Sequence, residues 1–322
     1  MRKASSRAAK KRPPKELYGG GDVINKLDRS KVLFLLVFAA PTIILYFIFC
    51  VYPIFSSIYT SFFSWSGYSE DMRFIGLGNY LEIIRDRGFL TAVRNDFIIV
   101  LGKEIFILVL SVLFAVSLTR LRFKKAEVGI YRFIFYFPNV LSVVIIATVW
   151  AFVFDPINGL LNALLEMIGL GGAIPPEGWL VKYPLPSIIT VASWCGIGLF
   201  MIVMIAAINN VSAELYEAAQ IDGAGEWRQL ITITMPAVWH QIKFAIITIL
   251  YSSLGNNFTL VRRMFGSAVN DSSSVMGLYV YQQGFDSLTP RVGYANAAGV
   301  IMLVITATVS LLANHFLTRK ED

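Results

Sequence analysis

A cluster of uncharged polar side chains interrupts the apolar run at residues 241–261 and could bind a solute by hydrogen bonding. Amide and hydroxyl groups are costly in an apolar environment, so each is expected to have a partner there. An asparagine amide both donates and accepts hydrogen bonds, which suits a solute rich in hydroxyl groups, and aromatic rings can cover the apolar faces of such a solute. The candidate solute ligands are Tyr251, Ser253, Asn256, Asn257 and, from an earlier apolar run, Trp194.

The helical repeat groups these polar residues by face. On a continuous helix Ser252, Asn256 and Thr259 share one face, and Ser253 and Asn257 share the adjoining face. A second interpretation stays open, in which the amides join neighbouring helices, as polar residues commonly do in membrane bundles.

Other residue types that perform chemistry are sparse. The chain has two cysteines, Cys50 and Cys195, and two histidines, His240 and His315, which are too few and too widely spaced to indicate a metal site. No phosphate-binding G-x-x-x-x-G-K-[ST] loop occurs in the sequence, and no catalytic constellation can be placed on one element. We therefore expect a non-catalytic chain without a cofactor of its own.

The composition identifies the environment of these residues. Of 322 residues 56% are hydrophobic and 15% are charged, and the mean hydropathy of +0.63 is outside the range of soluble domains. About twenty apolar residues span a bilayer as a helix, so the sequence predicts an all-α integral membrane protein with six spans. We place the spans near residues 32–62, 97–118, 131–154, 187–208, 241–261 and 294–316.

The distribution of Lys and Arg predicts the orientation. Residues 1–31 form a basic tail with ten Lys and Arg, and nine more fall in segments on the same side of the six spans, residues 120–132 and 210–243 among them, against eight on the other side. The positive-inside rule then places both termini, including the short segment 318–322, in the cytoplasm. A basic tail beside a membrane helix indicates contact with anionic lipid rather than with nucleic acid. Lys103 and Glu104 lie inside the second span, where charge is costly and often functional.

Residues Asn210 to Pro236, which we call the elbow, form the longest polar interruption of the C-terminal half. Ser212 is a suitable N-cap for a first helix, and Gly223 suits the left-handed stop after it. A second helix is expected from about Gly225 until Pro236 forbids continuation. The elbow therefore predicts a helix-turn-helix.

The elbow resembles the EAA loop of permease subunits of bacterial ATP-binding-cassette importers, written EAA, three residues, G, nine residues, I-x-L-P. The matching residues are Glu217, Ala218, Ala219, Gly223, Ile233 and Pro236, with Met235 in place of leucine. The resemblance implies that this loop is cytoplasmic and that its first helix docks on an ATPase subunit. It implies coupling roles for Glu217, Ala218, Ala219, Asp222 and Gly223.

Two further stretches resemble the carbohydrate-type permeases of these importers. They are FIGLGNY at residues 74–80 and a W…F-x-P-x-x-G-x-x-N string with Trp150, Phe154, Pro156, Gly159 and Asn162. Turn and helix-end chemistry also explains the proline, glycine and asparagine positions of the second string, and we favour that interpretation for each of them. Residues 264–285 lack the G-G-P string usual after the fifth span, so the sequence leaves the conformation of this loop open.

The resemblance covers residues 32–317, the expected six-helix permease domain. It implies two ATPase subunits that bind ATP and Mg²⁺, a second permease that is similar but not identical, and an external binding protein, in the bacterial inner membrane. The expected substrate is an oligosaccharide or a related sugar. Alternatives are the same machinery for an amino acid or a phosphate ester, and, in another class, a membrane-embedded enzyme or a passive channel.

Overall fold

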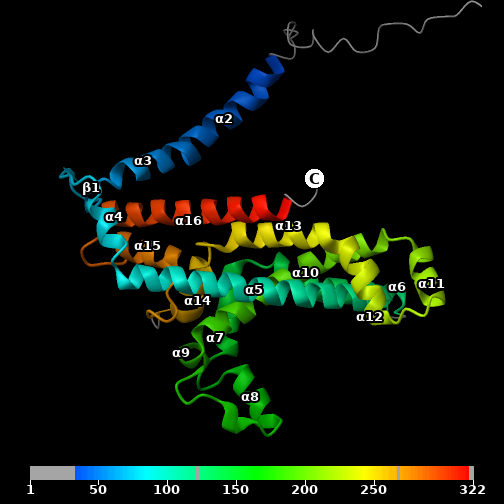
Figure 1. Cartoon of the computed structure of the whole chain (residues 1–322). Helices are drawn as coiled ribbons and strands as arrows, with labels where there is room; N and C mark the ends of the chain where they lie inside the picture. Colours follow the sequence, from blue (N-terminus) through cyan, green and yellow to red (C-terminus); the bar gives the residue numbers. More distant parts are fainter. Residues whose placement is uncertain (1–32, 121–122, 267–268, 319–322) are drawn as a thin grey trace, which may run out of the picture. The chain divides into compact units, whose positions relative to one another are not determined.

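The computed structural model describes residues 33–120, 123–266 and 269–318, and these residues are mainly helical (Figure 1). The predicted basic tail 1–31 and residues 319–322 lie outside the described residues. The chain divides into two compact units, one up to Ser56 and one from Ser57 onward.

The described part of the first unit is apolar helix that continues to Thr60. It comprises η1 (Leu35–Ala39), α2 (Ala40–Tyr46), η2 (Phe47–Val51) and α3 (Tyr52–Thr60). Residues 36–60 have the length and composition of a membrane span, and large apolar side chains such as Phe38 and Phe49 are exposed along it. Such a surface suits contact with lipid.

Three π-helical segments in the described residues each end two residues before a proline. Segments η1, η2 and η4 (Leu230–Thr234) precede Pro41, Pro53 and Pro236. Proline has no N–H to donate and its ring clashes with the carbonyl four residues earlier. The wider π turn offers a local adjustment around this clash, and the helix runs through each proline.

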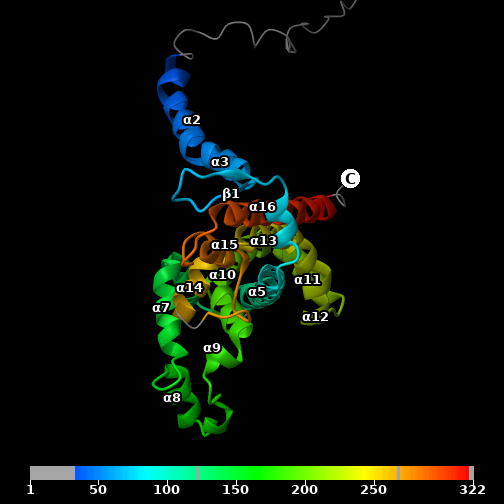
Figure 2. The same cartoon turned by 90° about the vertical axis from the view of Figure 1, so that its left-hand side faces the viewer.

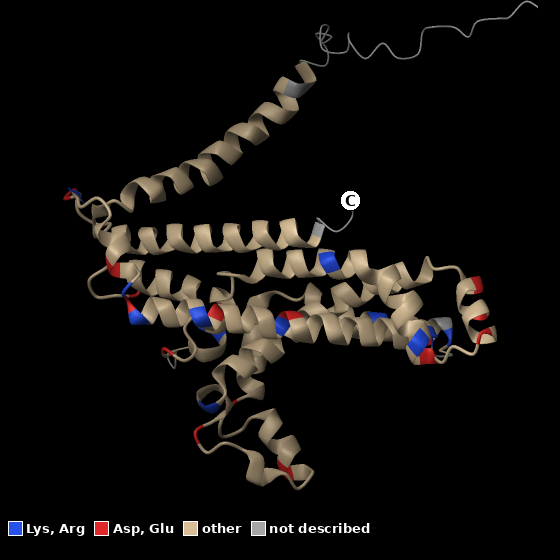
Figure 3. Ribbon diagram, viewed as in Figure 1, with Lys and Arg blue, Asp and Glu red and all other residues tan. Residues whose placement is uncertain are grey.

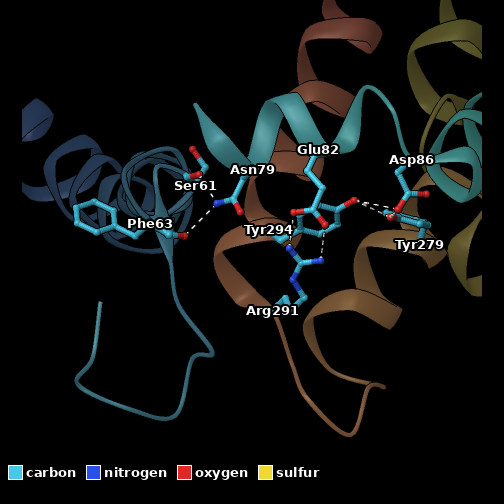
Figure 4. Close-up of polar contacts among 8 residues, drawn as sticks. All are labelled: Ser61, Phe63, Asn79, Glu82, Asp86, Tyr279, Arg291 and Tyr294. Carbon is cyan, nitrogen blue, oxygen red and sulfur yellow. Dashed lines mark hydrogen bonds and ion pairs between the residues drawn. The ribbon is translucent and has the colours of Figure 1, made fainter. Parts of the chain in front are cut away.

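The second unit opens with a short hairpin and α4 (Gly78–Ile83). Strand β1 (Phe63–Ser64) pairs antiparallel with β2 (Arg73–Phe74), which adds a small β element to a fold predicted to be all-α. The Nδ2 atom of Asn79, from the FIGLGNY stretch, donates to the carbonyl oxygens of Ser61 at 2.8 Å and of Phe63 at 3.0 Å (Figure 4). This buried asparagine thus fixes α4 beside the hairpin, and we call this end of the unit the hairpin end.

Four long helices lie side by side in both views of the second unit (Figures 1 and 2). They are α5 (Arg87–Arg120), α10 (Pro184–Asn209), α13 (Met235–Ser253) and α16 (Val292–Thr318). Buried Ile, Met, Ala and Val side chains fill the space between α5, α10 and α13. The elbow lies at the opposite end from the hairpin, and we call that end the elbow end.

Helices α5 and α10 are packed closely along much of their length. A Cβ atom added to Gly102 would lie 2.6 Å from Ile189 Cδ1, and one added to Gly196 would lie 2.5 Å from Ile107 Cδ1. Ser111 Oγ also donates to the Ile197 carbonyl oxygen at 2.9 Å. Glycine at these positions lets the two backbones approach, so the helices form a tight pair.

The segment predicted as the third span, residues 131–154, is not one continuous helix. The segment consists of α6 (Lys125–Val140) and α7 (Val143–Val153), which are bent by 101° at the break between them. Pro138 lies in the last turn of α6, Leu141 is extended, and Ser142 caps α7 by accepting a hydrogen bond from the Val144 N–H. Proline and an N-cap residue together restart the helix in a new direction.

Residues 154–183 connect α7 to α10 through α8 (Leu160–Met167), η3 (Gly171–Ala173) and α9 (Trp179–Lys182), and they project away from the four long helices (Figures 1 and 2). Asp155 Oδ1 accepts hydrogen bonds from the N–H groups of Ile157 and Asn158. Asn162 Nδ2 donates to two carbonyl oxygens of the turn and Asn162 Oδ1 accepts from Trp179 Nε1 at 2.7 Å. Turn contacts therefore account for Asn162, as favoured above.

The fifth span differs from its predicted bounds. It runs over residues 226–253, from α12 (Glu226–Gln229) through η4 into α13, and then breaks. Pro236 does not end the second arm of the elbow, contrary to the prediction, because η4 precedes it and the helix continues. After the break follow α14 (Phe258–Phe265) and α15 (Met276–Gly284).

The described residues contain five helices that are long and apolar enough to cross a membrane, or six if the bent pair α6–α7 is one span. Charged residues are rare along most of these helices and lie mainly in the connecting segments and the elbow (Figure 3). The predicted multi-pass membrane architecture is confirmed at this level.

Candidate functional site

The elbow forms the turn that its sequence predicts. Helix α11 (Ala213–Ile221) begins at Ser212, whose Oγ accepts a hydrogen bond from the Glu214 N–H at 3.2 Å. It ends before Gly223, which has a positive φ of 76°. Helix α12 then starts at Glu226 and continues into the fifth span. The elbow is therefore a short helix held out between two membrane-spanning helices.

The surface of α11 carries the residues of the EAA pattern. Glu217, Ala218, Asp222 and Gly223 are exposed and Ala219 is half-buried. Large apolar side chains of the elbow are also exposed, with Leu215 at 55%, Ile221 at 86% and Trp227 at 76%. This mixture of exposed small, apolar and acidic residues makes the elbow a candidate docking surface for another protein.

The opposite face of α11 is anchored to the long helices. Tyr216 is buried, and its ring lies 3.6 Å below the guanidinium carbon of Arg120, the last residue of α5. The Tyr216 hydroxyl is 3.2 Å from Thr234 Oγ1. Arg120 Nη2 donates to Gln229 Oε1, and Gln229 Nε2 donates to the Ala224 carbonyl oxygen in the turn at 2.8 Å. These contacts join the elbow to α5.

Sequence reasoning did not identify Arg120 or Gln229 as functional residues. Arg120 counted only as one charge of a basic connecting segment, and Gln229 is 109 positions away from it in the chain. A buried glutamine whose two side-chain atoms both have partners can be found only when the packing of α5 on the elbow is known.

The candidate solute ligands lie on both sides of a break in the fifth span. Helix α13 ends at Ser253 and α14 starts at Phe258, with Gly255 at a φ of 79° between them. A Cβ atom on Gly255 would also lie 2.8 Å from Met302 Sδ. The proposed common face of Ser252, Asn256 and Thr259 is therefore wrong, because no continuous helix connects them.

The structure brings some of these candidates to the surface and buries others. Tyr251 and Asn256 are exposed, and Asn256 Nδ2 donates to the Ser252 carbonyl oxygen at 3.2 Å. Ser253 and Asn257 are buried. On α10, Trp194 is 37% exposed and its ring makes an edge contact with Trp150 at 5.7 Å between centroids. Their roles as solute ligands remain predictions.

Asn257 makes the contact that links this break to α5. Its Nδ2 donates to Asp96 Oδ1 at 2.7 Å and to the Ser253 carbonyl oxygen at 3.2 Å. Asp96 Oδ2 accepts a hydrogen bond from the Met276 N–H at 2.8 Å, at the start of α15. The adjacent Asn95 donates to the carbonyl oxygens of Asp271 and Ser274, both at 2.9 Å.

Asp96 is a fully buried carboxylate that the sequence analysis missed. The predicted second span began one residue after it, whereas α5 begins at Arg87. An aspartate within an apolar helix is itself a signal of function or of a structural hydrogen bond, and correct bounds would have revealed it. Lys103 follows Asp96 by seven positions, two helical turns along the same face, and its neighbour Glu104 is also buried.

A hollow of about 830 Å³ adjoins the break, between α14, α15 and the start of α7. The rings of Phe258 and Tyr281 lie in its wall, tilted by 39° with their centroids 5.0 Å apart. Arg262 forms an ion pair with Asp286 at 2.8 Å in the same wall. The hollow thus combines aromatic faces with charged and amide groups, the set of groups that can bind a polar solute with apolar ring faces.

The hairpin end is held together by a cluster of ionised and phenolic groups (Figure 4). Asp86 Oδ2 accepts hydrogen bonds from the hydroxyls of Tyr279 at 2.9 Å and Tyr294 at 3.1 Å. Arg291 contacts both carboxylate oxygens of Glu82, at 2.7 Å and 2.6 Å. These bonds from Arg291 lower the pKa of Glu82. Burial acts to raise the pKa of Asp86, but hydrogen bonds from the Phe89 N–H and the two tyrosines lower it overall.

Within residues 33–120, 123–266 and 269–318, no three His, Cys, Asp or Glu side chains are placed to hold a metal ion. The described polar groups form the exposed surface of the elbow, join helices by hydrogen bonds and line a hollow. A bundle of membrane helices with an exposed cap-turn-helix elbow and a broken fifth span defines a membrane transport component.

Comparison with known proteins identifies the family. Residues 107–322 match the model of the binding-protein-dependent transport system inner membrane component. The diacetylchitobiose uptake system permease protein NgcF of Streptomyces coelicolor is 31% identical over 318 residues, which cover 96% of this chain and 89% of that protein. The arabinooligosaccharides transport system permease protein AraP of Bacillus subtilis is 27% identical, with 86% of each chain covered.

Solved structures agree with this assignment. A chain of a bacterial ATP-binding-cassette transporter for import of the acidic polysaccharide alginate matches with a TM-score of 0.75 at 25% identity, covering 91% of this chain and 97% of that one. The same kind of transporter, in complex with a periplasmic protein bound to an alginate pentasaccharide, gives a TM-score of 0.74 at 26% identity, with 90% and 95% covered. The chain belongs to the family of binding-protein-dependent transport system inner membrane components, and it is a transport component rather than a catalyst.

Proposed function

We propose that the chain is the permease subunit through which an ATP-driven importer moves an oligosaccharide across the bacterial cytoplasmic membrane. The observation that carries the proposal is the elbow, whose EAA residues and apolar side chains are exposed between two spans. Relatives named as permeases for diacetylchitobiose and arabinooligosaccharides support the substrate class.

The proposal requires partners. Because the sequence lacks a phosphate-binding loop, ATP and Mg²⁺ are bound by separate ATPase subunits that dock on α11. A second, similar permease completes the pathway, and an external binding protein delivers the solute, as in the alginate system. Both termini and the elbow face the cytoplasm in six passes, with α6 and α7 together forming the third. The exposed apolar side chains of residues 36–60 contact lipid.

The geometry suggests which segments move with the ATPase and which segments contact the solute. Closure of the ATPase pair moves the elbow, and the tightly packed α5–α10 pair moves with it. The broken fifth span and the adjoining hollow offer amide, hydroxyl and aromatic groups at the solute side. Backbone that departs from helix within a membrane is expected where it lines a cavity or is buried in protein.

The test uses the tagged chain in its native membranes. Co-purification with two ATPase subunits and a second permease, followed by mass spectrometry of the ligand on the binding protein, should identify an oligosaccharide. The variant Glu217→Ala removes the charged residue of the EAA triplet, and its matched control Glu214→Ala removes another exposed acid of α11.

We expect Glu217→Ala to abolish solute uptake and to weaken retention of the ATPase, since a charge-assisted hydrogen bond contributes about 1.5–3 kcal/mol. Glu214→Ala should keep most of the solute uptake and most of the bound ATPase. Normal uptake by both variants, or purification of the unaltered chain without any ATPase, would show that the elbow is only a connector between spans.

A further inference from the structure

Helix α5 is fastened at both ends to segments that are distant in the sequence. At the elbow end, Arg120 stacks on Tyr216 and donates to Gln229, which in turn holds the Ala224 carbonyl of the turn. Toward the hairpin end, Asp96 holds Asn257 at the break of the fifth span and the Met276 N–H at the start of α15. Asn95 beside it holds the loop over residues 271–274.

The helix between these two attachments is uninterrupted. Residues 87–120 are one α-helix, so Asp96 and Arg120 are separated by about 36 Å of regular backbone. The contacts of Gly102 with Ile189 and of Gly196 with Ile107 lock this helix against α10. Since α10 leads directly into the elbow, both members of the pair are connected to it, one covalently and one through Arg120.

Most of the side chains that join α5 to the other segments are buried. If α5 moved without those segments, these side chains would lose their hydrogen-bond partners. Asp96 is fully buried and Asn257 and Gln229 are nearly so. A buried carboxylate or amide that loses its hydrogen-bond partner is strongly disfavoured. The bonded segments therefore follow α5 when it moves, rather than sliding past it.

We propose that Arg120 and Asp96 are positioning residues through which a displacement of the elbow is carried along α5 to the break in the fifth span and to the loop over residues 271–276. The inference rests on the proposed function, because the displacement originates in the ATPase. The loop that lacks the usual G-G-P string is then attached to α5 by the side chains of Asn95 and Asp96.

The test measures movement at the hairpin end when nucleotide binds at the elbow end. The complex with its ATPase and second permease is placed in nanodiscs after Cys50 and Cys195 are replaced by alanine. Spin labels are attached through Ser272→Cys, on the loop fastened to α5, and Tyr68→Cys, in the hairpin segment. Gly293 N donates to the Trp65 carbonyl oxygen at 3.0 Å, so the hairpin segment is a reference fixed to α16.

Addition of ATP and vanadate should shift the distance distribution between the labels in the unaltered background. Arg120→Lys loses the planar fork and the stacking, and Asp96→Asn replaces one of the two carboxylate oxygens, each of which accepts a hydrogen bond, with an amide NH2 that cannot accept. We expect each to reduce the shift by at least half, while the ATPase stays bound. The controls Arg228→Lys and Asp71→Asn, at exposed positions, should leave the shift unchanged.

Two further variants separate transmission from a structural role. The double substitution Asp96→Asn with Asn257→Asp restores a carboxylate–amide pair in reverse, and it should recover the shift. Arg120→Lys combined with Asp96→Asn should retain about the product of the fractions that the two single variants retain, because the two act in series. Independent residues so far apart would instead have additive effects.

A full shift in both single variants, or additive losses in their combination, would overturn the inference while leaving the proposed function intact. The inference would also be overturned if the variants that lose the shift melted at a lower temperature and the reversed pair did not recover the shift. The residues would then only stabilise the fold. If the unaltered chain retains no ATPase, the proposed function fails and the inference with it.

Discussion

The guanidinium of Arg120 lies 3.6 Å from the centre of the Tyr216 ring, which is buried under it. The next two residues, Glu217 and Ala218, face outward from the same helix. A helix of nine residues thus has one face anchored to the transmembrane bundle and one face free for a partner. This arrangement allows a force applied to the free face to reach the bundle without bending the turn.

The orientation of the chain can be tested by chemical labelling. With Cys50 and Cys195 replaced, Glu226→Cys in the elbow should be unreactive toward a membrane-impermeant thiol reagent in intact cells, and it should react after the membrane is opened. Asp271→Cys, in the loop held by Asn95, should react in intact cells. The reverse pattern would contradict both the orientation and the coupling role of the elbow.

The turn of the elbow should be sensitive to its glycine through backbone conformation alone. Gly223 has a φ of 76°, yet a Cβ atom there would meet nothing within 4 Å. A left-handed conformation costs about 1–2 kcal/mol for an ordinary L-residue, and a β-branched residue is a clear outlier there. We therefore expect Gly223→Val to abolish uptake and ATPase retention while membrane insertion is normal.

The matched control is Gly225→Ala. Gly225 also has open space around it, but its φ of −66° is accessible to alanine. Near-normal uptake by this control and loss of uptake by Gly223→Val would separate backbone strain from the mere addition of a side chain. Normal uptake by both variants would mean that the turn geometry is unimportant.

The two asparagines of the break should respond differently to leucine. Asn257→Leu removes a buried donor to Asp96, and an unpaired buried polar group costs about 1–3 kcal/mol, so the detergent-solubilised complex should melt at a lower temperature. Asn256→Leu should leave the melting temperature nearly unchanged because its side chain is exposed. Reduced apparent affinity for solute in Asn256→Leu alone would place that residue among the solute ligands.

The ion pair at the hairpin end predicts a dependence of stability on pH. Hydrogen bonds from Arg291 lower the pKa of Glu82, so this carboxylate stabilises the fold above its unfolded pKa, about 4.3, and the contribution is lost as the pH falls through the lower folded value. The side chains are about half exposed, which limits the pair to about 1 kcal/mol. Glu82→Gln should therefore lower the melting temperature slightly at pH 7, and the difference should vanish near pH 3.

A difference that persists at pH 3 would show that Glu82 acts through packing rather than charge. High salt should also reduce the difference at pH 7, since exposed pairs are screened. The control is Glu70→Gln, which changes one exposed acid of the hairpin segment.

The elements that could be predicted are those with a local chemical cause. The cap at Ser212 and the glycine stop at Gly223 depend on neighbouring residues only, and both are observed. The role of Pro236 was misjudged for the same reason. Pro236 alone forbids regular helix, but the π turn at Leu230–Thr234 adjusts to it, and no local rule applied to the sequence indicated that turn.

The polar sites were harder to predict because their partners are remote in the chain. Asn257 was selected as an unusual polar residue, but its partner Asp96 is 161 positions away in the chain. Helical periodicity also placed Asn256 and Ser252 on one face, whereas Gly255 ends the regularity between them. Only tertiary packing decides which amide is buried and which is exposed.

The π turn before Pro236 has a consequence for the angular register of the elbow. Each residue of an α-helix advances about 100° around the axis, so the extra residue of a π turn rotates everything beyond it by that angle. The face of α13 that meets α5 and the direction in which α12 leaves the bundle are therefore set by the number of residues from 226 to 236. We expect deletion of a single residue there to turn the exposed face of α11 away from the proposed ATPase even if every side chain of that face were retained.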